Sequence, residues 1–304
     1  MLGPVTVIGG ANTDIMGFSS APLIAADSNP GYVRLSAGGV GRNIAENLAR
    51  LGVSTRLVTA FGEGYDALML ADKCRAAGID VRPIPAPGVP GSRYLAIMDA
   101  DGDMALAIND MRALDAVTPA ALDAHAAALD DAAIIVLDTN MPRETLEHIA
   151  VRWGATQLML DAVSVAKAPR AIKMLKSLHT LKCNALEAAA FAGTQPDDLD
   201  AAADALIAAG VGRVVITAGG AGALMAFGTE RVMFVPPHVE VANATGAGDA
   251  FMAGLVYATL AGMDATHAAA FSSAMAAVAL ASERTVSEAV SESLALDRME
   301  AMLS

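Results

Sequence analysis

Cysteines, aromatic residues and long apolar runs are scarce in this sequence. The 304 residues include two cysteines, and aromatic residues make up 4% of the chain. Two cysteines provide no disulfide framework, so we expect a reducing, cytoplasmic location. The apolar stretch from His267 to Ala281 contains two serines and is shorter than a membrane span of about 18 residues. The first apolar run ends at Gly9, too early for a signal peptide, and we expect no association with membranes.

Positive charge is also in short supply. Lys and Arg number 20 against 33 Asp and Glu, which gives a net charge of −13. This balance argues against a nucleic-acid backbone as a partner, although a local pocket can still attract a small anion. The five histidines are scattered and do not indicate a metal site. Hydrophobic residues make up 54% of the chain, which is enough for a sizeable aliphatic core.

The stretch NATGAGDA, residues 243–250, carries the clearest chemical signal. Gly246, Ala247 and Gly248 leave the backbone uncovered, and an apolar run typical of a buried helix follows. Free N–H groups at the start of a helix bind anions, most often phosphate. Asp249 adds a carboxylate there, and a base beside a phosphate pocket is the minimum equipment for phosphoryl transfer. The alternative is that Asp249 only caps a core helix.

Two polar side chains follow the first predicted strand. Pro4–Ile8 is predicted to be a buried strand, and Asn12 and Asp14 after it lie on one side if the chain stays extended. In open α/β sheets, ligands bind at the carboxyl ends of strands. The amide and the carboxylate could therefore hold a pair of sugar hydroxyls; the alternative is a simple turn.

A glycine-rich loop then leads into a predicted helix. The loop contains Gly38, Gly39 and Gly41, and Gly52 ends the helix. It has neither the GxGxxG pattern with a downstream carboxylate of dinucleotide-binding proteins nor the lysine of a P-loop. The glycines would let a small neutral ligand approach the backbone, where Asn43 could hydrogen-bond it.

Two irregular segments predict a small separate sheet. Residues 17–36 are polar and irregular, and long excursions of this kind are more often functional than idle. Tyr94–Met98 and Met104–Ile108 are predicted to form a hairpin around an Asp-rich turn. We interpret that turn as a solvated loop rather than a calcium site. Residues 12–36 and 92–110 should together form a lid.

From Pro119 onward, predicted strands and helices alternate. This alternation favours βαβ units, and we expect residues 1–304 to form one α/β domain with a mostly parallel sheet. Helices should dominate from Asp249 to the end. The predicted strands are Ala133–Leu137, Gln157–Leu160, Leu178–Leu181 and Arg213–Thr217.

Two further polar groups follow these strands. Asn184 and Glu187 lie three residues apart at a predicted helix start, so they share a face and could hold magnesium through water. Thr217, Gly219 and Gly222 form a second turn with exposed backbone, which suits a nucleotide.

Taken together and in this order, the motifs resemble those of the ribokinase-like (PfkB) family of sugar and nucleoside kinases, over nearly the whole chain. The resemblance implies a large parallel sheet flanked by helices, with a small β-sheet lid. It also implies that Asp249 deprotonates the acceptor hydroxyl while residues 246–248 form the anion hole. The implied substrate residues are Asn12, Asp14, Gly38, Gly39 and Asn43, and the implied nucleotide residues are Asn184, Thr217, Gly219, Gly222, Thr245, Gly246 and Gly248.

The same resemblance implies cofactors and a partner. The cofactors are ATP and Mg²⁺, with Glu187 and Asn184 organising the metal, Asn184 through water. The lid of many members pairs with a second subunit, which implies a homodimer. One position departs from the pattern, because Asn243 stands where many members have the Asp of a monovalent-cation site. The sequence therefore leaves potassium activation open.

Four segments narrow the choice of substrate that the resemblance implies. They resemble those of family members that phosphorylate the 5′-hydroxyl of the C-nucleoside pseudouridine. Ser28 and Asn109, which belong to the predicted lid, could match the donors and acceptors of an uncharged uracil ring. Ribose, another nucleoside, or a catalytically silent nucleoside-binding role on the same fold are the alternatives. The segments are Ala26–Gly31, Gly39–Ala45, Ile108–Met111 and Asp161–Ser164.

Overall fold

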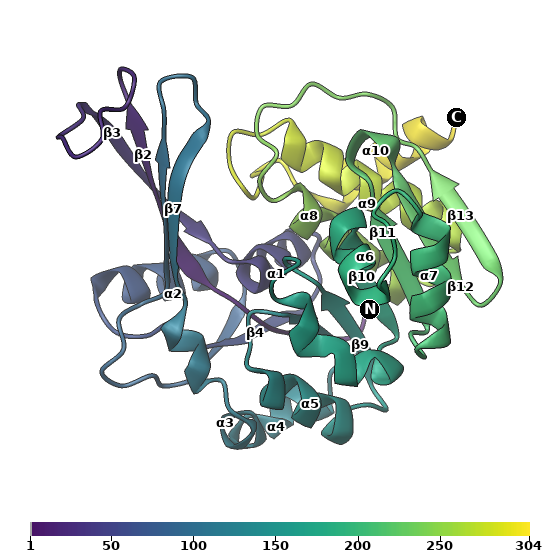
Figure 1. Cartoon of the computed structure of the whole chain (residues 1–304). Helices are drawn as coiled ribbons and strands as arrows, with labels where there is room; N and C mark the ends of the chain where they lie inside the picture. The colour runs from purple at the N-terminus through teal and green to yellow at the C-terminus, as the bar shows by residue number, and fades with distance from the viewer. Residues whose placement is uncertain (1) are drawn as a thin grey trace.

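The computed structural model describes residues 2–304 and contains two separate sheets (Figure 1). The larger sheet has nine strands, and all of its neighbouring pairs are parallel except those that involve β12. This architecture confirms the predicted α/β class. In spatial order the strands are β13 (Glu230–Phe234), β12 (Ala223–Phe227), β11 (Arg213–Thr217), β10 (Thr180–Asn184), β9 (Gln157–Asp161), β8 (Ile134–Asp138), β1 (Val5–Ile8), β4 (Thr55–Thr59) and β5 (Asp80–Pro83).

Helices cover both faces of the larger sheet because its central strands are apolar on both sides. In β8, Ile134 and Val136 join one core cluster, whereas Ile135 and Leu137 join the other. Continuous apolar strands of this kind are typical of buried parallel sheets. On one side lie α1 (Val40–Arg50), α2 (Tyr65–Ala76), α8 (Ala247–Leu260), α9 (Ala265–Leu280) and α10 (Glu292–Leu303); on the other lie α3 (Pro119–Ala124), α4 (Ala126–Asp130), α5 (Arg143–Arg152), α6 (Ala185–Ala192), α7 (Leu199–Ala208) and the 3₁₀ segment η2 (Ala168–Ser177).

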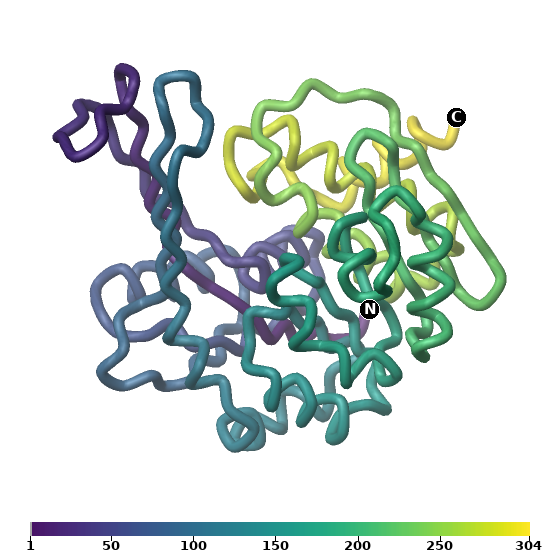
Figure 2. The backbone as a smooth tube through the Cα atoms, viewed as in Figure 1, coloured from purple at the N-terminus to yellow at the C-terminus, as the bar shows by residue number. Residues whose placement is uncertain are grey.

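The smaller sheet stands away from this body (Figure 2). The alternation pattern missed its first hairpin, since residues 17–36 were expected to be irregular and only residues 20–30 lie between the strands. Both faces of that hairpin are partly open to solvent, so it lacks the apolar periodicity that identifies a buried strand. Its strand order is β3 (Gly31–Gly38), β2 (Asn12–Ser19), β6 (Arg93–Met98) and β7 (Met104–Asp110).

The two ends of the small sheet's first hairpin connect directly to the core. Strand β2 begins shortly after β1, and β3 ends two residues before α1 begins. Gly39 fills the junction with a φ of 101°, and a Cβ there would lie 2.4 Å from the Gly10 carbonyl oxygen. Only glycine tolerates both conditions, which explains this part of the glycine-rich loop.

Three strands at the edges of the larger sheet were not predicted. Strand β5 and the β12–β13 hairpin extend the larger sheet at its two edges, where short strands give weak sequence signals. Helix α8 begins at Ala247, within the glycine motif rather than after it. No helix within residues 2–304 is long and apolar enough to cross a membrane.

Candidate active site

Four strands of the large sheet end in polar residues at the same edge. Because β8, β9, β10 and β11 are parallel neighbours, their carboxyl ends meet there. Asp138 is paired in register with Asp161, and Asn184 with Thr217. This edge is where open α/β sheets bind ligands.

Helix α8 directs Asp249 toward that edge. The helix begins after Gly246, whose φ of 88° is left-handed, and no side chain caps it. Instead of capping, the Asp249 carboxylate accepts a hydrogen bond from Asn43 on α1, with Nδ2 2.7 Å from Oδ2. The alternative interpretation of Asp249 as a helix cap is therefore wrong.

The surroundings of Asp249 bring its pKa close to neutral pH. Burial of the carboxylate, followed by the nearby charge of Asp161, raises the pKa of Asp249 to about 7. The hydrogen bond from Asn43 and the charge of Lys182 act in the opposite direction. A carboxylate tuned in this way is suited to accept a proton from an alcohol, since a base works best near the operating pH.

A buried ion pair lies next to the backbone of the anion motif. Lys182 Nζ is 2.9 Å from Asp161 Oδ2, and both side chains are almost fully buried. Burial is the largest single influence and would lower the pKa of Lys182, but the charge and hydrogen bond of Asp161 and the charges of Asp249 and Glu187 together outweigh it and raise that pKa. A Cβ built on Gly248 would lie 3.0 Å from Nζ, so the ammonium faces the motif directly. This cation can offset the negative charge of a phosphoryl group there.

Asp138 ties the first strand to the first helix. Its Oδ2 accepts hydrogen bonds from the backbone N–H groups of Gly10, at 2.7 Å, and Gly41, at 3.0 Å. Beside it, Asn140 Oδ1 accepts a 2.5 Å hydrogen bond from Lys167. The carboxylate therefore fixes the start of the helix that carries Asn43.

Sequence reasoning missed Asp138, Asp161 and Lys182 as site residues. A signal was present, because each is a charged residue at or near the carboxyl end of an apolar strand, in IIVLD, QLMLD and TLKCN. Charged residues are almost never fully buried unless they are paired. Applying that rule at the strand ends would have selected all three.

The predicted sugar-binding residues assemble at the base of the small sheet. Asn12 Nδ2 donates a 2.6 Å hydrogen bond to Asp14 Oδ1, so the two side chains do share a face. Burial raises the pKa of Asp14. A Cβ on Gly38 would come within 2.3 Å of the Asp14 carboxylate, which explains the glycine beside it.

Asn109 and Ser28 have different positions relative to Asp14. Strand pairing places Ser36, Asp14, Tyr94 and Asn109 in one row across the sheet. Paired residues of neighbouring strands point to the same face, so Asn109 faces the same way as Asp14. Ser28 is exposed in the loop of residues 20–30 that joins β2 to β3, and the structure does not bring it to this row.

Asn184 and Glu187 form a reciprocal cap at the start of α6. Glu187 Oε2 accepts from the Asn184 N–H at 2.8 Å, and Asn184 Oδ1 accepts from the Glu187 N–H at 2.9 Å. These bonds occupy the Asn184 oxygen but leave Glu187 Oε1 without a hydrogen-bonding partner in the described chain. One free carboxylate oxygen suits a hydrated Mg²⁺, which is commonly held by one or two carboxylates and waters. Asn184 positions that carboxylate.

The predicted nucleotide turn lies at the adjacent strand end. Thr217 ends β11, and the short 3₁₀ turn η3 (Gly219–Ala221) follows it. Gly219 and Gly222 have φ values of 57° and 99°, so this turn requires glycine at both positions. Residues 219–221 of the turn are exposed, as the sequence predicted, whereas Gly222 is buried.

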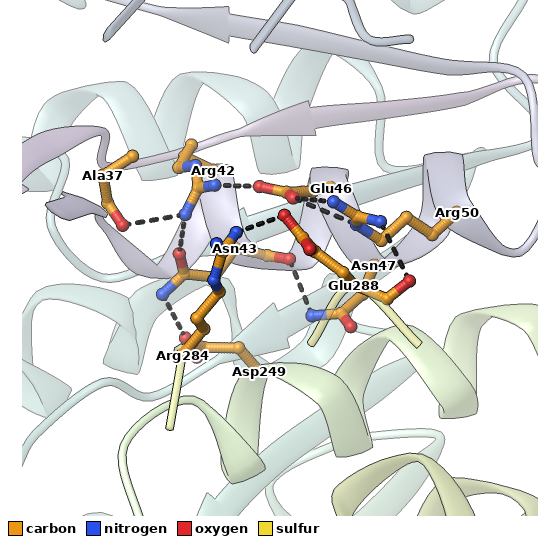
Figure 3. Close-up of polar contacts among 9 residues, drawn as sticks. All are labelled: Ala37, Arg42, Asn43, Glu46, Asn47, Arg50, Asp249, Arg284 and Glu288. Carbon is orange, nitrogen blue, oxygen red and sulfur yellow. Dashed lines mark hydrogen bonds and ion pairs between the residues drawn. The ribbon is translucent and has the colours of Figure 1, made fainter. Parts of the chain in front are cut away.

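A stripe of charged side chains on α1 fixes the orientation of Asn43 (Figure 3). Arg42 Nη1 donates to Asn43 Oδ1 at 2.6 Å, so Asn43 must present its Nδ2 group to Asp249. Arg42 also pairs with Glu46, which in turn pairs with Arg50. The stripe borders a cleft of about 650 Å³ between α1 and the small sheet, and Asp249 is not among the residues that line it.

Comparison with known proteins gives the class to which this fold and site belong. Residues 4–291 match the family described as pfkB family carbohydrate kinase. The chain therefore belongs to the pfkB family and is a sugar or nucleoside kinase.

Individual proteins that resemble this chain are also sugar or nucleoside kinases. The pseudouridine kinase of Escherichia coli is 36% identical over 92% of this chain and 91% of its own length. A carbohydrate kinase from Agrobacterium tumefaciens has 30% identity and a TM-score of 0.87, covering 99% of this chain and 97% of that one. The ribokinase of Arabidopsis thaliana, complexed with ribose and ATP, has a TM-score of 0.86 at 21% identity over 99% of both chains, a likeness of fold.

Proposed function

We propose that this kinase transfers the γ-phosphate of ATP to the 5′-hydroxyl of a nucleoside, with pseudouridine as the favoured substrate. The observation that carries the proposal is the Asp249 carboxylate. It is held by Asn43, has a pKa raised to about 7, and lies on the first turn of α8 beside the bare backbone of residues 246–248. A base and an anion hole within one helical turn are suited to phosphoryl transfer.

In this mechanism Asp249 accepts the proton of the substrate hydroxyl while the hydroxyl oxygen attacks the γ-phosphorus. The bond from that phosphorus to the β,γ-bridging oxygen breaks, and ADP leaves with its electron pair. The N–H groups of residues 246–248 and the Lys182 ammonium stabilise the charge on the transferred phosphoryl oxygens. When bound, Mg²⁺ would neutralise phosphate charge, and Glu187 Oε1 is the atom available to hold its water shell.

The preference for pseudouridine rests on sequence similarity to a named relative and on lid chemistry. Asp14 and Asn12 can bind ribose hydroxyls, while Asn109 lies in the same row and can pair with an uncharged ring. Ser28 would reach the ligand only if the β2–β3 loop of the lid comes close to the bound nucleoside. Ribose or another nucleoside is the second candidate, since Asp14 recognises a sugar whatever it carries.

The exposed face of the small sheet supports a homodimer. Five aliphatic side chains, each at least 36% exposed, lie on the face opposite Asp14. A contiguous apolar patch on a short sheet is typical of an interface, and an identical patch on a second copy can cover it. We also propose the cytoplasm as the location, because both cysteines are free thiols. The five side chains are Val33, Leu35, Leu95, Leu106 and Ile108.

An ADP-release assay with ATP, Mg²⁺ and a panel of pseudouridine, uridine, adenosine, ribose and no acceptor tests the function. We expect the highest kcat/KM with pseudouridine, and phosphate on its 5′-oxygen by mass spectrometry and NMR. Faster turnover of ribose would reassign the substrate. The absence of turnover with every acceptor, together with tight binding of one of them, would favour a catalytically silent nucleoside-binding protein.

A further inference from the structure

Two segments far apart in the chain form the support behind the anion motif. The approach to α8 runs beside the loop that follows α9 (Figure 2), and Ala242 N–H donates a 2.8 Å hydrogen bond to the Leu280 carbonyl. A Cβ on Gly246 would lie 2.1 Å from the Thr285 carbonyl oxygen, so this loop touches the motif backbone. The position of the loop therefore affects the position of the anion-binding N–H groups.

Asn243 holds the two segments together with its side-chain amide. Its Oδ1 accepts a hydrogen bond from Thr245 N–H at 2.9 Å, and its Nδ2 donates to the Glu283 carbonyl at 3.2 Å. The two partners fix the orientation of the amide, because a flipped amide would set donor against donor and acceptor against acceptor. The side-chain N–H of Asn243 thus faces the Glu283 carbonyl.

This arrangement does not fit the monovalent cation that the family resemblance implies. Such a cation needs oxygen ligands, whereas here a nitrogen donor occupies the space in front of the Glu283 carbonyl and the carboxylate is replaced by an amide. An Asp at position 243 would place a charged oxygen opposite that carbonyl oxygen. The two oxygens would repel each other unless a cation lay between them.

We infer that the Asn243 amide takes the place of the cation, so that the enzyme needs no potassium. The amide and the Glu283 carbonyl make directly the connection that a carboxylate, a cation and a carbonyl would otherwise make together. Other contacts hold the same loop without an ion: Arg284 pairs with Glu288, and Arg50 Nη1 donates to the Glu288 carbonyl at 3.4 Å (Figure 3). The inference rests on the proposed kinase reaction only for its activity measurement.

The test compares wild type with Asn243→Asp and Asn243→Ala in equal concentrations of potassium chloride and tetramethylammonium chloride. We expect wild type to show the same melting temperature and the same kcat in both salts. In the tetramethylammonium salt, Asn243→Asp should lose about tenfold in kcat. Potassium should restore that kcat and raise the melting temperature of this variant.

Asn243→Ala serves as the matched control, since it removes the amide without supplying a carboxylate. It should lose activity in both salts and gain nothing from potassium. Potassium stabilisation or activation of wild type, or of the Ala variant, would overturn the inference, as would an Asp variant that behaves like wild type in both salts. The melting experiment needs no substrate, so it stands even if the nucleoside panel shows no turnover.

Discussion

The body around the large sheet and the small sheet, which we propose acts as a lid, place their polar side chains in very different surroundings. Every residue of β8 is buried, whereas most residues of β7 are exposed. In the body, an unpartnered polar group is costly where it is buried or half-buried, so Asp138, Asp161 and the half-buried Asp249 each have defined partners. The lid has few such constraints. Substitutions in the body should therefore change turnover and stability, and substitutions in the lid should change substrate affinity and assembly.

The largest effect should follow substitution of the base in the body. Asp249→Asn keeps an oxygen that can accept from Asn43 but cannot take up a proton. Loss of a general base costs about 10²–10⁴-fold in rate, and we expect kcat to fall by that factor while ATP and pseudouridine still bind. A variant that keeps most of its turnover would mean that another group is the base.

The pH dependence checks the same residue independently. Since only the carboxylate form can act, kcat/KM should fall about tenfold per pH unit below about 7, the pKa of Asp249. The folded pKa of Asp249 lies above the unfolded value of 3.8. Between pH 3.8 and about 7 the folded state therefore binds more protons than the unfolded state, and stability falls as the pH rises through that window. Asp249→Asn should accordingly melt above wild type at pH 8, with a difference that narrows at lower pH.

The buried ion pair separates stability from catalysis. Lys182→Met alone leaves Asp161 buried and uncompensated, which should cost about 3–5 kcal/mol of unfolding free energy. The double variant Lys182→Met with Asp161→Leu should recover most of that stability but remain about 10²-fold slower, because the cation beside Gly248 is absent. Denaturant melts and steady-state rates measure both. Full activity in the double variant would reduce the pair to a structural role.

In the lid, the largest effect should be on affinity. Asp14→Ala removes a charged acceptor of hydroxyl hydrogen bonds worth about 1.5–3 kcal/mol, so KM for a ribonucleoside should rise about 10–100-fold. The melting temperature should hardly change. KM for the 2′-deoxy analogue should rise far less, and equal losses for both would assign Asp14 another task. Asp101→Ala, in the exposed turn of the same sheet, is the control and should leave KM unchanged.

The smallest effect on the single chain concerns the apolar face of the lid. Leu106→Lys with Ile108→Lys should convert a dimer to a monomer, because each chain would bury two like charges against the same two of its partner. Light scattering measures the mass, and the melting temperature of the isolated chain should stay nearly constant. Val151→Lys, the same kind of change at an exposed position of α5, should leave the dimer intact. A monomeric wild type at working concentration contradicts the proposed assembly.

The sequence predicted the body better than the lid for a physical reason. Apolar strands such as β8 and β9 stand out because both of their faces are buried. The lid strand β3 has five exposed residues in succession, so its hydrophobicity pattern predicted an irregular segment instead of a strand. The sequence did predict that this segment belongs to the lid. Short-range motifs located Asp249 and the capping pair of α6. The ion pair of Lys182 and Asp161 escaped because it joins residues whose contact depends on strand order.

The way in which the lid joins the body makes it an exchangeable cassette. Its first hairpin leaves the body at Ala11 and returns at Gly39, where a Cβ on Gly39 would lie 2.6 Å from the Ala11 Cα atom. The second hairpin leaves and returns at Arg93 and Asp110, which are paired in register. Segments whose ends nearly touch can be swapped without moving the scaffold. Over evolutionary time, one phosphoryl-transfer body could therefore acquire new acceptors by replacing two hairpins, and a protein engineer could graft them in the same way.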